Sequence, residues 1–100
     1  MRTIHADTVT EAVARLCIDA NYDLNHDIEA ALSAFCQEEP SPNGREILQD
    51  ILTNAKLARK CAMPICQDTG MAMFRVEVGQ DVHIEGGALT DAINAGVRQG

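Results

Sequence analysis

The sequence predicts an α+β fold, in which an N-terminal helical bundle is followed by a short β-hairpin and a further helix. Up to about residue 60, apolar side chains recur three or four positions apart, which is the period of amphipathic helices. Over residues 71–78 the period changes to two, as in a half-buried strand. Helices followed by strands are typical of α+β domains, where helices pack on each other and on one face of a small sheet.

The first two helices are expected over residues 8–20 and 26–39. Thr8 and Glu11 have the spacing of a capping box, which satisfies free backbone N–H groups at a helix start. Residues 21–23 (Asn-Tyr-Asp) then interrupt the apolar pattern, which predicts a turn between the two helices.

The third helix is expected to be the best formed. Ser41 is a suitable N-cap, and Pro42 occupies the first helical position, where its missing N–H costs nothing. The apolar pattern continues to about Lys60, and the basic residues of the last turn complement the helix dipole.

The hairpin is expected to join a strand over residues 72–78 to a short strand over residues 82–84. Residues 79–81 (Gly-Gln-Asp) read as its turn, and the glycine pair at 86–87 ends the second strand. A fourth helix then starts near Leu89 and reaches the end of the sequence without a clear stop signal.

Composition limits the class of protein. The 100 residues, 46% of them hydrophobic, carry 15 acidic and 8 basic side chains, for a net charge of -7, which fits one soluble acidic unit with one small core. Scattered basic residues exclude nucleic acid as a partner, and an anionic membrane surface would repel the chain. The sequence has neither an apolar run of the ~18 residues that span a bilayer nor a secretory leader, so we expect a cytoplasmic protein.

Four cysteines are too few for a disulfide scaffold, so free thiols are expected. Cys17 and Cys36 lie on apolar helical faces and are predicted to be core residues. Cys61 reads as a packing residue at a helix end. An alternative is a zinc or redox site built from Cys61, Cys66 and His83, but the pair lacks C-x-x-C spacing and a fourth ligand.

The segment between the third helix and the first predicted strand fits neither period. It reads Pro-Ile-Cys-Gln-Asp-Thr-Gly over residues 64–70. Functional side chains concentrate on such loops, and here Pro64 prevents the helix from continuing, so Cys66 would be presented rather than packed. The simpler alternative is a turn in which Asp68 and Thr69 bond the local backbone.

This motif resembles the signature of class I fumarases and L-tartrate dehydratases, the oxygen-sensitive iron–sulfur hydro-lyases. The resemblance covers essentially the whole chain, which looks like the N-terminal third of the alpha subunit in the two-subunit form. Besides the motif, five stretches carry it: residues 4–5, 16–22, 44–48, 79–84 and 91–97.

The resemblance implies a role for three residues of the motif. In this family the motif cysteine is one of three thiolates that hold a 4Fe–4S cluster, so Cys66 would be a metal ligand. Gln67 and Asp68 would contact the dicarboxylate substrate, and Asp68 is the candidate for proton transfer. The reaction implied is the reversible hydration of fumarate to malate, a step of the tricarboxylic acid cycle, or the dehydration of tartrate.

The resemblance also implies that this chain is a truncated portion of a larger domain. Within residues 1–100, the part up to residue 62 would be helical and residues 63–100 would carry the cluster motif, the hairpin and the next helix. The family's other two cluster ligands lie later in the alpha subunit, and an acidic fragment lacks the cations that a dianion needs. We therefore expect an oligomer with a beta subunit, or, as the alternative, an assembly module that is catalytically inactive in isolation.

Overall fold

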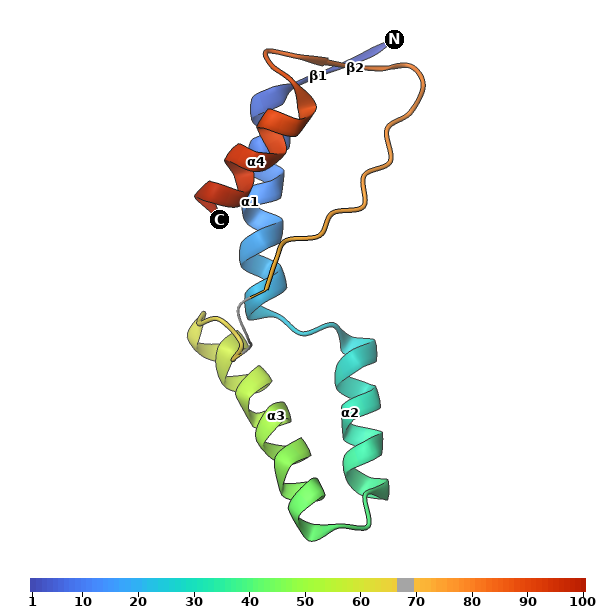
Figure 1. The fold of residues 1–100 in the computed structure, drawn as a ribbon, viewed down its shortest axis with the longest axis vertical. Coiled ribbons are helices and arrows are strands. Elements are labelled where there is room, and N and C mark those ends of the chain that lie inside the picture. Colours follow the sequence, from blue (N-terminus) through green and yellow to red (C-terminus); the bar gives the residue numbers. More distant parts are fainter. Residues whose placement is uncertain (67–69) are drawn as a thin grey trace. The chain divides into compact units, whose positions relative to one another are not determined.

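The structure, a computed structural model, describes residues 1–66 and 70–100. Among these residues it contains two short strands and four helices (Figure 1). The chain divides into two compact units, one formed by Met1–Asp19 together with Thr69–Gly100 and the other by Ala20–Asp68. The α+β class predicted from the sequence is confirmed.

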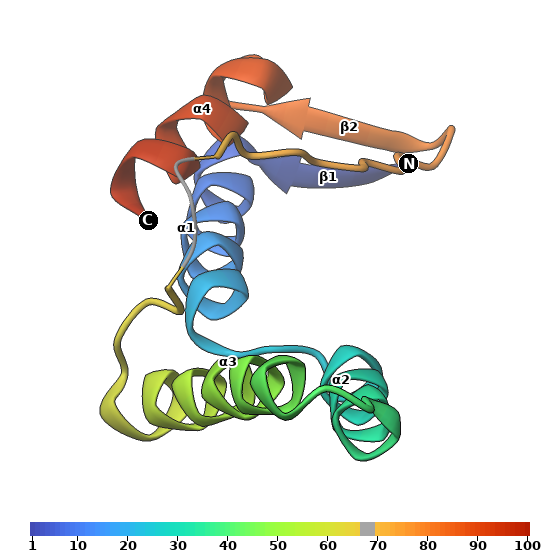
Figure 2. The same cartoon turned by 60° about the horizontal axis from the view of Figure 1, so that its bottom comes forward.

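The first unit is built on a parallel pair of strands. β1 (Arg2–His5) pairs with β2 (Val82–Glu85) in the register Arg2 with Val82 to His5 with Glu85, and Figure 2 shows the two strands side by side. A parallel pair needs a long connection, because a tight turn can join only antiparallel neighbours. Here a strand at the start of the sequence pairs with a strand that begins only at Val82.

The predicted hairpin is therefore wrong. Residues 70–79 form no strand, and all of them are exposed. Alternation of apolar and polar residues shows which side chains would share a face of a strand. A strand also needs a neighbouring strand for its backbone hydrogen bonds. Within the described chain, β2 pairs with β1 and not with residues 72–78. The turn at residues 79–81 is present, with the Val82 N–H donating to the Gly79 carbonyl at 3.1 Å.

The capping box at Thr8 and Glu11 is also wrong, because α1 (Ala6–Tyr22) begins before Thr8. His5 supplies a cap instead: the Asp7 N–H donates to His5 Nδ1 at 3.1 Å. Thr8 lies inside the first turn of the helix, where its side chain cannot act as the N-cap.

The N-terminal part of α1 packs against α4 (Leu89–Gln99) at close range. The Thr10 hydroxyl donates to the Ala92 carbonyl at 2.9 Å, and Ala6, Val13 and Ala92 are buried. At Gly96 an added Cβ would lie 2.6 Å from Val13 Cβ and 2.7 Å from the Thr10 carbonyl oxygen. Only glycine lets the two helix backbones approach so closely.

The second unit is a helical hairpin formed by α2 (His26–Glu38) and α3 (Pro42–Cys61). Ser41 caps α3 as predicted, because its side chain accepts the Gly44 N–H at 3.3 Å. Cys36 is buried between the helices and directs its Sγ to the Arg45 carbonyl at 3.6 Å. These helices match the predicted ranges within one residue at each end.

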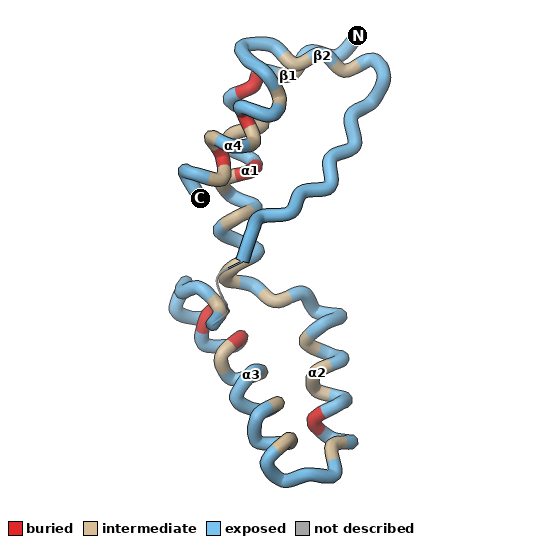
Figure 3. The backbone as a smooth tube through the Cα atoms, viewed as in Figure 1, coloured by how far each residue is buried: buried red, intermediate tan, exposed pale blue. Residues whose placement is uncertain are grey.

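Burial is limited in both units. The buried apolar residues are mostly alanines, whereas several large side chains of the predicted apolar faces remain exposed, with Phe35 at 62% and Ile47 at 60% (Figure 3). Among the described residues, no helix combines the length and apolar character needed to cross a bilayer.

We predict that Gly96→Ala destabilises the first unit by about 1–3 kcal/mol, because the new methyl group overpacks the contact between α1 and α4. Gly79→Ala is the matched control, since its added Cβ meets only Val82 Cγ2 at 3.6 Å. Urea unfolding followed by circular dichroism measures both changes. Equal midpoints for the two variants would contradict the close approach at Gly96.

Candidate functional site

The candidate site lies on the loop that follows α3. The helix ends at Ala62, which has left-handed backbone angles, φ 51° and ψ 49°. The Met63 N–H then donates back to the Ala58 carbonyl at 3.1 Å, the long bond of a Schellman-type helix end. This turn reverses the chain, so that residues 63 and 64 fold back over the last turns of α3.

Each backbone amide of the loop from residue 63 to residue 66 has an acceptor or needs none. Pro64 carries no N–H, and the Ile65 N–H donates to the Asn21 carbonyl at 2.6 Å. The Cys66 N–H donates to Asn54 Oδ1 at 2.9 Å. All three N–H groups of residues 63–66 thus hold the chain up to the cysteine of the motif.

Cys66 itself is exposed, as predicted for a presented thiol, although its backbone is held. Cys36 is 8% exposed and is the core residue that was predicted. Cys17 is only half-buried, so its prediction as a core residue holds in part. Cys61 is exposed at the end of α3 rather than packed, because the chain reverses beside it and covers only one side of the helix.

The other two predicted site residues, Gln67 and Asp68, lie outside the described residues. His83 is exposed on β2, between the half-buried Val82 and Ile84. In the described ranges 1–66 and 70–100, no three His, Cys, Asp or Glu side chains are grouped to hold a metal ion. Cys61 and Cys66 belong to one compact unit and His83 to the other, so the alternative zinc site at these residues stays a prediction.

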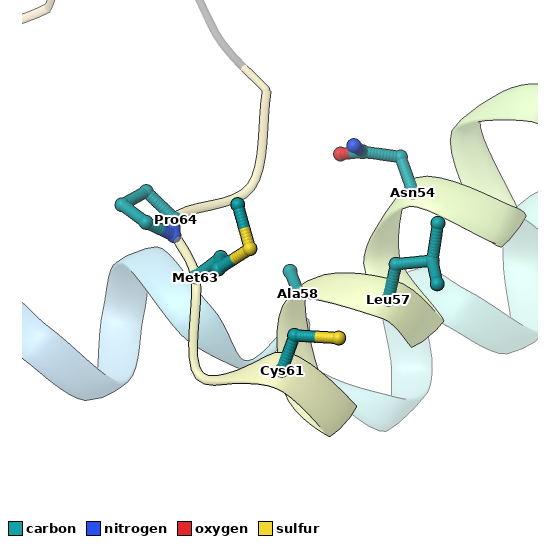
Figure 4. Close-up of a pocket in the computed structure, with 6 residues that line it drawn as sticks. All are labelled: Asn54, Leu57, Ala58, Cys61, Met63 and Pro64. Atoms are coloured by element: carbon teal, nitrogen blue, oxygen red, sulfur yellow. The ribbon is translucent and has the colours of Figure 1, made fainter.

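A shallow pocket lies beside the loop. Its volume is about 300 Å³, and four lining residues follow one face of α3 at positions 54, 57, 58 and 61, with Met63 and Pro64 opposite (Figure 4). Asn54 is the one strongly polar side chain in this lining. The lining is apolar and contains no cation to pair with a carboxylate.

Two arginines near the motif in the sequence, Arg59 and Arg75, are paired with carboxylates. Arg59 Nε lies 2.7 Å from Asp23 Oδ1, and Arg59 Nη2 lies 3.0 Å from Glu29 Oε2. Hydrogen bonds to Asp23 and then to Glu29 raise the pKa of Arg59 above its ordinary value, so the guanidinium stays charged and engaged. Arg75 likewise pairs with Glu77 at 2.7 Å.

These ion pairs bear on the substrate. A guanidinium that holds two carboxylates of its own chain is not available to clamp a dianion without losing them. The Arg59 pairs instead tie α3 to the turn before α2 and to α2 itself. Among the described residues, the site therefore offers an exposed thiol, while Arg59 and Arg75 are held by carboxylates of the chain itself.

Comparison with known protein families identifies the family of this chain. The model of the family described as "Fumarate hydratase (Fumerase)" matches residues 10–100, nearly the whole chain and the complete loop. The chain belongs to the fumarate hydratase (Fumerase) family. The resemblance seen in the motif and the five flanking stretches is thereby confirmed at the level of the family.

A curated relative shares the same region. A protein of Methanocaldococcus jannaschii, by its name the alpha subunit of an L(+)-tartrate dehydratase, is 28% identical over 75 residues. The match covers 75% of this chain and 26% of that relative, so the chain spans about a quarter of the relative's length. No solved structure matches the chain.

Two residues that hold the loop were missed in the sequence. Asn21 was read only as a helix breaker, and Asn54 lies in a helix whose apolar period drew attention to its neighbours. For Asn54, the signal in the sequence is an asparagine on one side of an amphipathic helix, because a half-buried side-chain amide needs a hydrogen-bond partner.

We predict that Cys66 and Cys61 in the folded, cluster-free protein react with a maleimide at least about tenfold faster than Cys36. Exposed thiols react directly, whereas Cys36 must wait for local opening, and each ~1.4 kcal/mol of opening free energy slows the reaction tenfold. Mass spectrometry of labelled peptides over time measures the rates. In denaturant the three rates should converge, and Cys36 labelling as fast as Cys66 without denaturant would contradict the burial.

Proposed function

We propose that this chain supplies one ligand, the Cys66 thiolate, to the 4Fe–4S cluster of a hydro-lyase that hydrates fumarate reversibly or dehydrates tartrate. The observation that carries the proposal is the exposed Cys66 on a loop whose backbone is held up to that residue, in a chain of the fumarate hydratase family. A cluster ligand needs this combination, because its sulfur must be accessible while its backbone stays in place.

The described residues fit such a cluster as a partial ligand set. Iron–sulfur clusters are held by cysteine thiolates, and Cys66 is an exposed cysteine at the family motif. No metal-holding group of three is assembled within residues 1–66 and 70–100, so the other two thiolates would come from elsewhere in the enzyme. A longer alpha subunit fits this requirement, since the chain matches only 26% of its relative.

When bound, the cluster would supply a Lewis-acidic iron that polarises the substrate hydroxyl and eases its departure. The residues of this chain would act around it. Cys66 would hold the metal centre, Gln67 would contact the dicarboxylate, and Asp68 would contact it and hold or move a proton. We further propose that the beta subunit and the rest of the alpha subunit provide the cations, because Arg59 and Arg75 are engaged.

A second candidate function is an assembly module without chemistry of its own. The large exposed side chains of α2 and α3, including Phe35 and Ile47, favour it, because such side chains commonly pack against further protein. The two candidates differ in one measurement. If the 100-residue chain alone took up stoichiometric iron and sulfide under anaerobic conditions, the purely structural function would be excluded.

We predict that Cys66→Ser in the complete enzyme, reconstituted anaerobically with its partner subunit, lowers fumarate or tartrate turnover at least about 100-fold. Loss of a second-shell partner already costs 10–100-fold at metal sites, and loss of a ligand costs at least as much. Iron content and the visible absorbance of the cluster should fall in parallel.

Cys61→Ser is the control, because it removes another exposed thiol five positions away. Its turnover and iron content should stay at the level of the unmodified enzyme. Full cluster content and turnover in Cys66→Ser would refute the ligand role of Cys66.

A further inference from the structure

We infer that Asn54 is the positioning residue of Cys66: its side-chain carbonyl fixes the backbone from which the thiolate reaches the cluster. This inference rests on the proposed function of Cys66 and extends it to a residue of α3 outside the motif. The observation behind it is the 2.9 Å hydrogen bond from the Cys66 N–H to Asn54 Oδ1.

The bond restricts where the sulfur can lie. The N, Cα and Cβ atoms of a residue have fixed covalent geometry, so an anchored N–H limits the direction of the Cα–Cβ bond. The thiol then has only the three staggered rotamers about that bond. Without the anchor, rotation of the Cys66 backbone would move the sulfur over a much wider range.

Among the three acceptors that hold the loop, Asn54 alone uses a side chain. Met63 and Ile65 donate to the backbone carbonyls of Ala58 and Asn21, which any residue at those positions would supply. The Cys66 anchor is different, because it depends on the side chain at position 54. The position of the Cys66 backbone therefore depends on the side chain of one residue of α3, Asn54.

The surroundings of Asn54 support this role. The side chain is half-buried at the edge of the pocket whose other lining residues are Leu57, Ala58, Cys61, Met63 and Pro64. Figure 4 shows its amide directed toward the chain that leads on from Pro64. The Cys66 N–H provides a hydrogen-bond partner for this polar group among apolar neighbours.

The alternative is that Asn54 merely stabilises α3, and helix propensity separates the two roles. Alanine is a better helix former than asparagine, so Asn54→Ala should leave the helix as stable or make it more stable. If Asn54 positions Cys66, the same substitution should instead weaken the retention of the cluster. Asn54→Asp keeps an acceptor oxygen at the same place, although its helix propensity is no better than that of asparagine.

The test uses the complete enzyme with its partner subunit and its reconstituted cluster. Three variants are compared: Asn54→Ala, Asn54→Asp and, as a control, Asn43→Ala, which removes an exposed asparagine near the start of the same helix. The measurements are the rate at which an iron(II) chelator removes cluster iron and, in the cluster-free protein, hydrogen exchange of the Cys66 amide.

We expect Asn54→Ala to release iron at least about tenfold faster than the unmodified enzyme, as for the loss of a second-shell partner. In the cluster-free protein its helix content should not fall, because alanine is the better helix former, and the Cys66 amide should lose protection from exchange. Asn54→Asp should retain iron better than Asn54→Ala, and Asn43→Ala should match the unmodified enzyme.

Two results would overturn the positioning role. One is iron release from Asn54→Ala at the unmodified rate, and the other is equal loss of iron from Asn54→Ala and Asn54→Asp. Cys66→Ser is measured alongside. If it keeps its cluster, the proposed function fails, whereas its loss of the cluster together with an unaffected Asn54→Ala overturns the positioning role alone.

Discussion

The structure of the site depends on satisfying the backbone N–H groups of the loop after α3. A chain that leaves a helix and reverses at once cannot form regular hydrogen bonds, and unpaired amides are costly when shielded from water. Here the left-handed Ala62 directs the first amide to the helix end, and Pro64 removes the second. The next two amides reach the carbonyl of Asn21 and the side chain of Asn54. The exposure of the Cys66 sulfur follows, since the backbone is held while the side chain has no covering neighbour.

Electrostatics gives the loop a second constraint. Arg59 lies on the last turns of α3 and holds Asp23 and Glu29, so the helix that carries the loop is tied to α2 and to the turn before it. These pairs are partly exposed, and such pairs contribute modestly to stability, but they decide which cations remain available. The acidic net charge of the chain and the paired arginines support the proposal that cations for a dicarboxylate come from other protein surfaces.

The sequence predicted the local features of this protein well and the distant ones poorly. Helical period located α2, α3 and α4, and the Ser41 cap and the Pro64 break are local signals that a few residues contain. The strand over residues 72–78 failed because alternation describes the faces of a strand and says nothing about its partner. β1 was missed because four residues directly before a helix give too short a pattern, and its pairing with β2 depends on contacts across nearly the whole sequence.

For the candidate site, the exposure of Cys66 was predictable from the motif, since it depends on a turn and a proline within a few residues. The sequence could not reveal the link from Asn54 to Cys66, because it depends on how far the chain folds back over α3 after Ala62. The burial of Cys36 was predictable from helical period, whereas the exposure of Cys61 depends on that same reversal.

The parallel pairing of β1 with β2 sets an order of events during synthesis. Arg2 cannot meet Val82 until the ribosome has made the residues between them, which takes about 4–16 s at 5–20 residues per second. The hairpin of α2 and α3 uses neighbouring segments only, and helical hairpins of this kind close on far shorter timescales. The hairpin of α2 and α3 can therefore form first on the nascent chain. β1 stays unpaired until β2 has been synthesised.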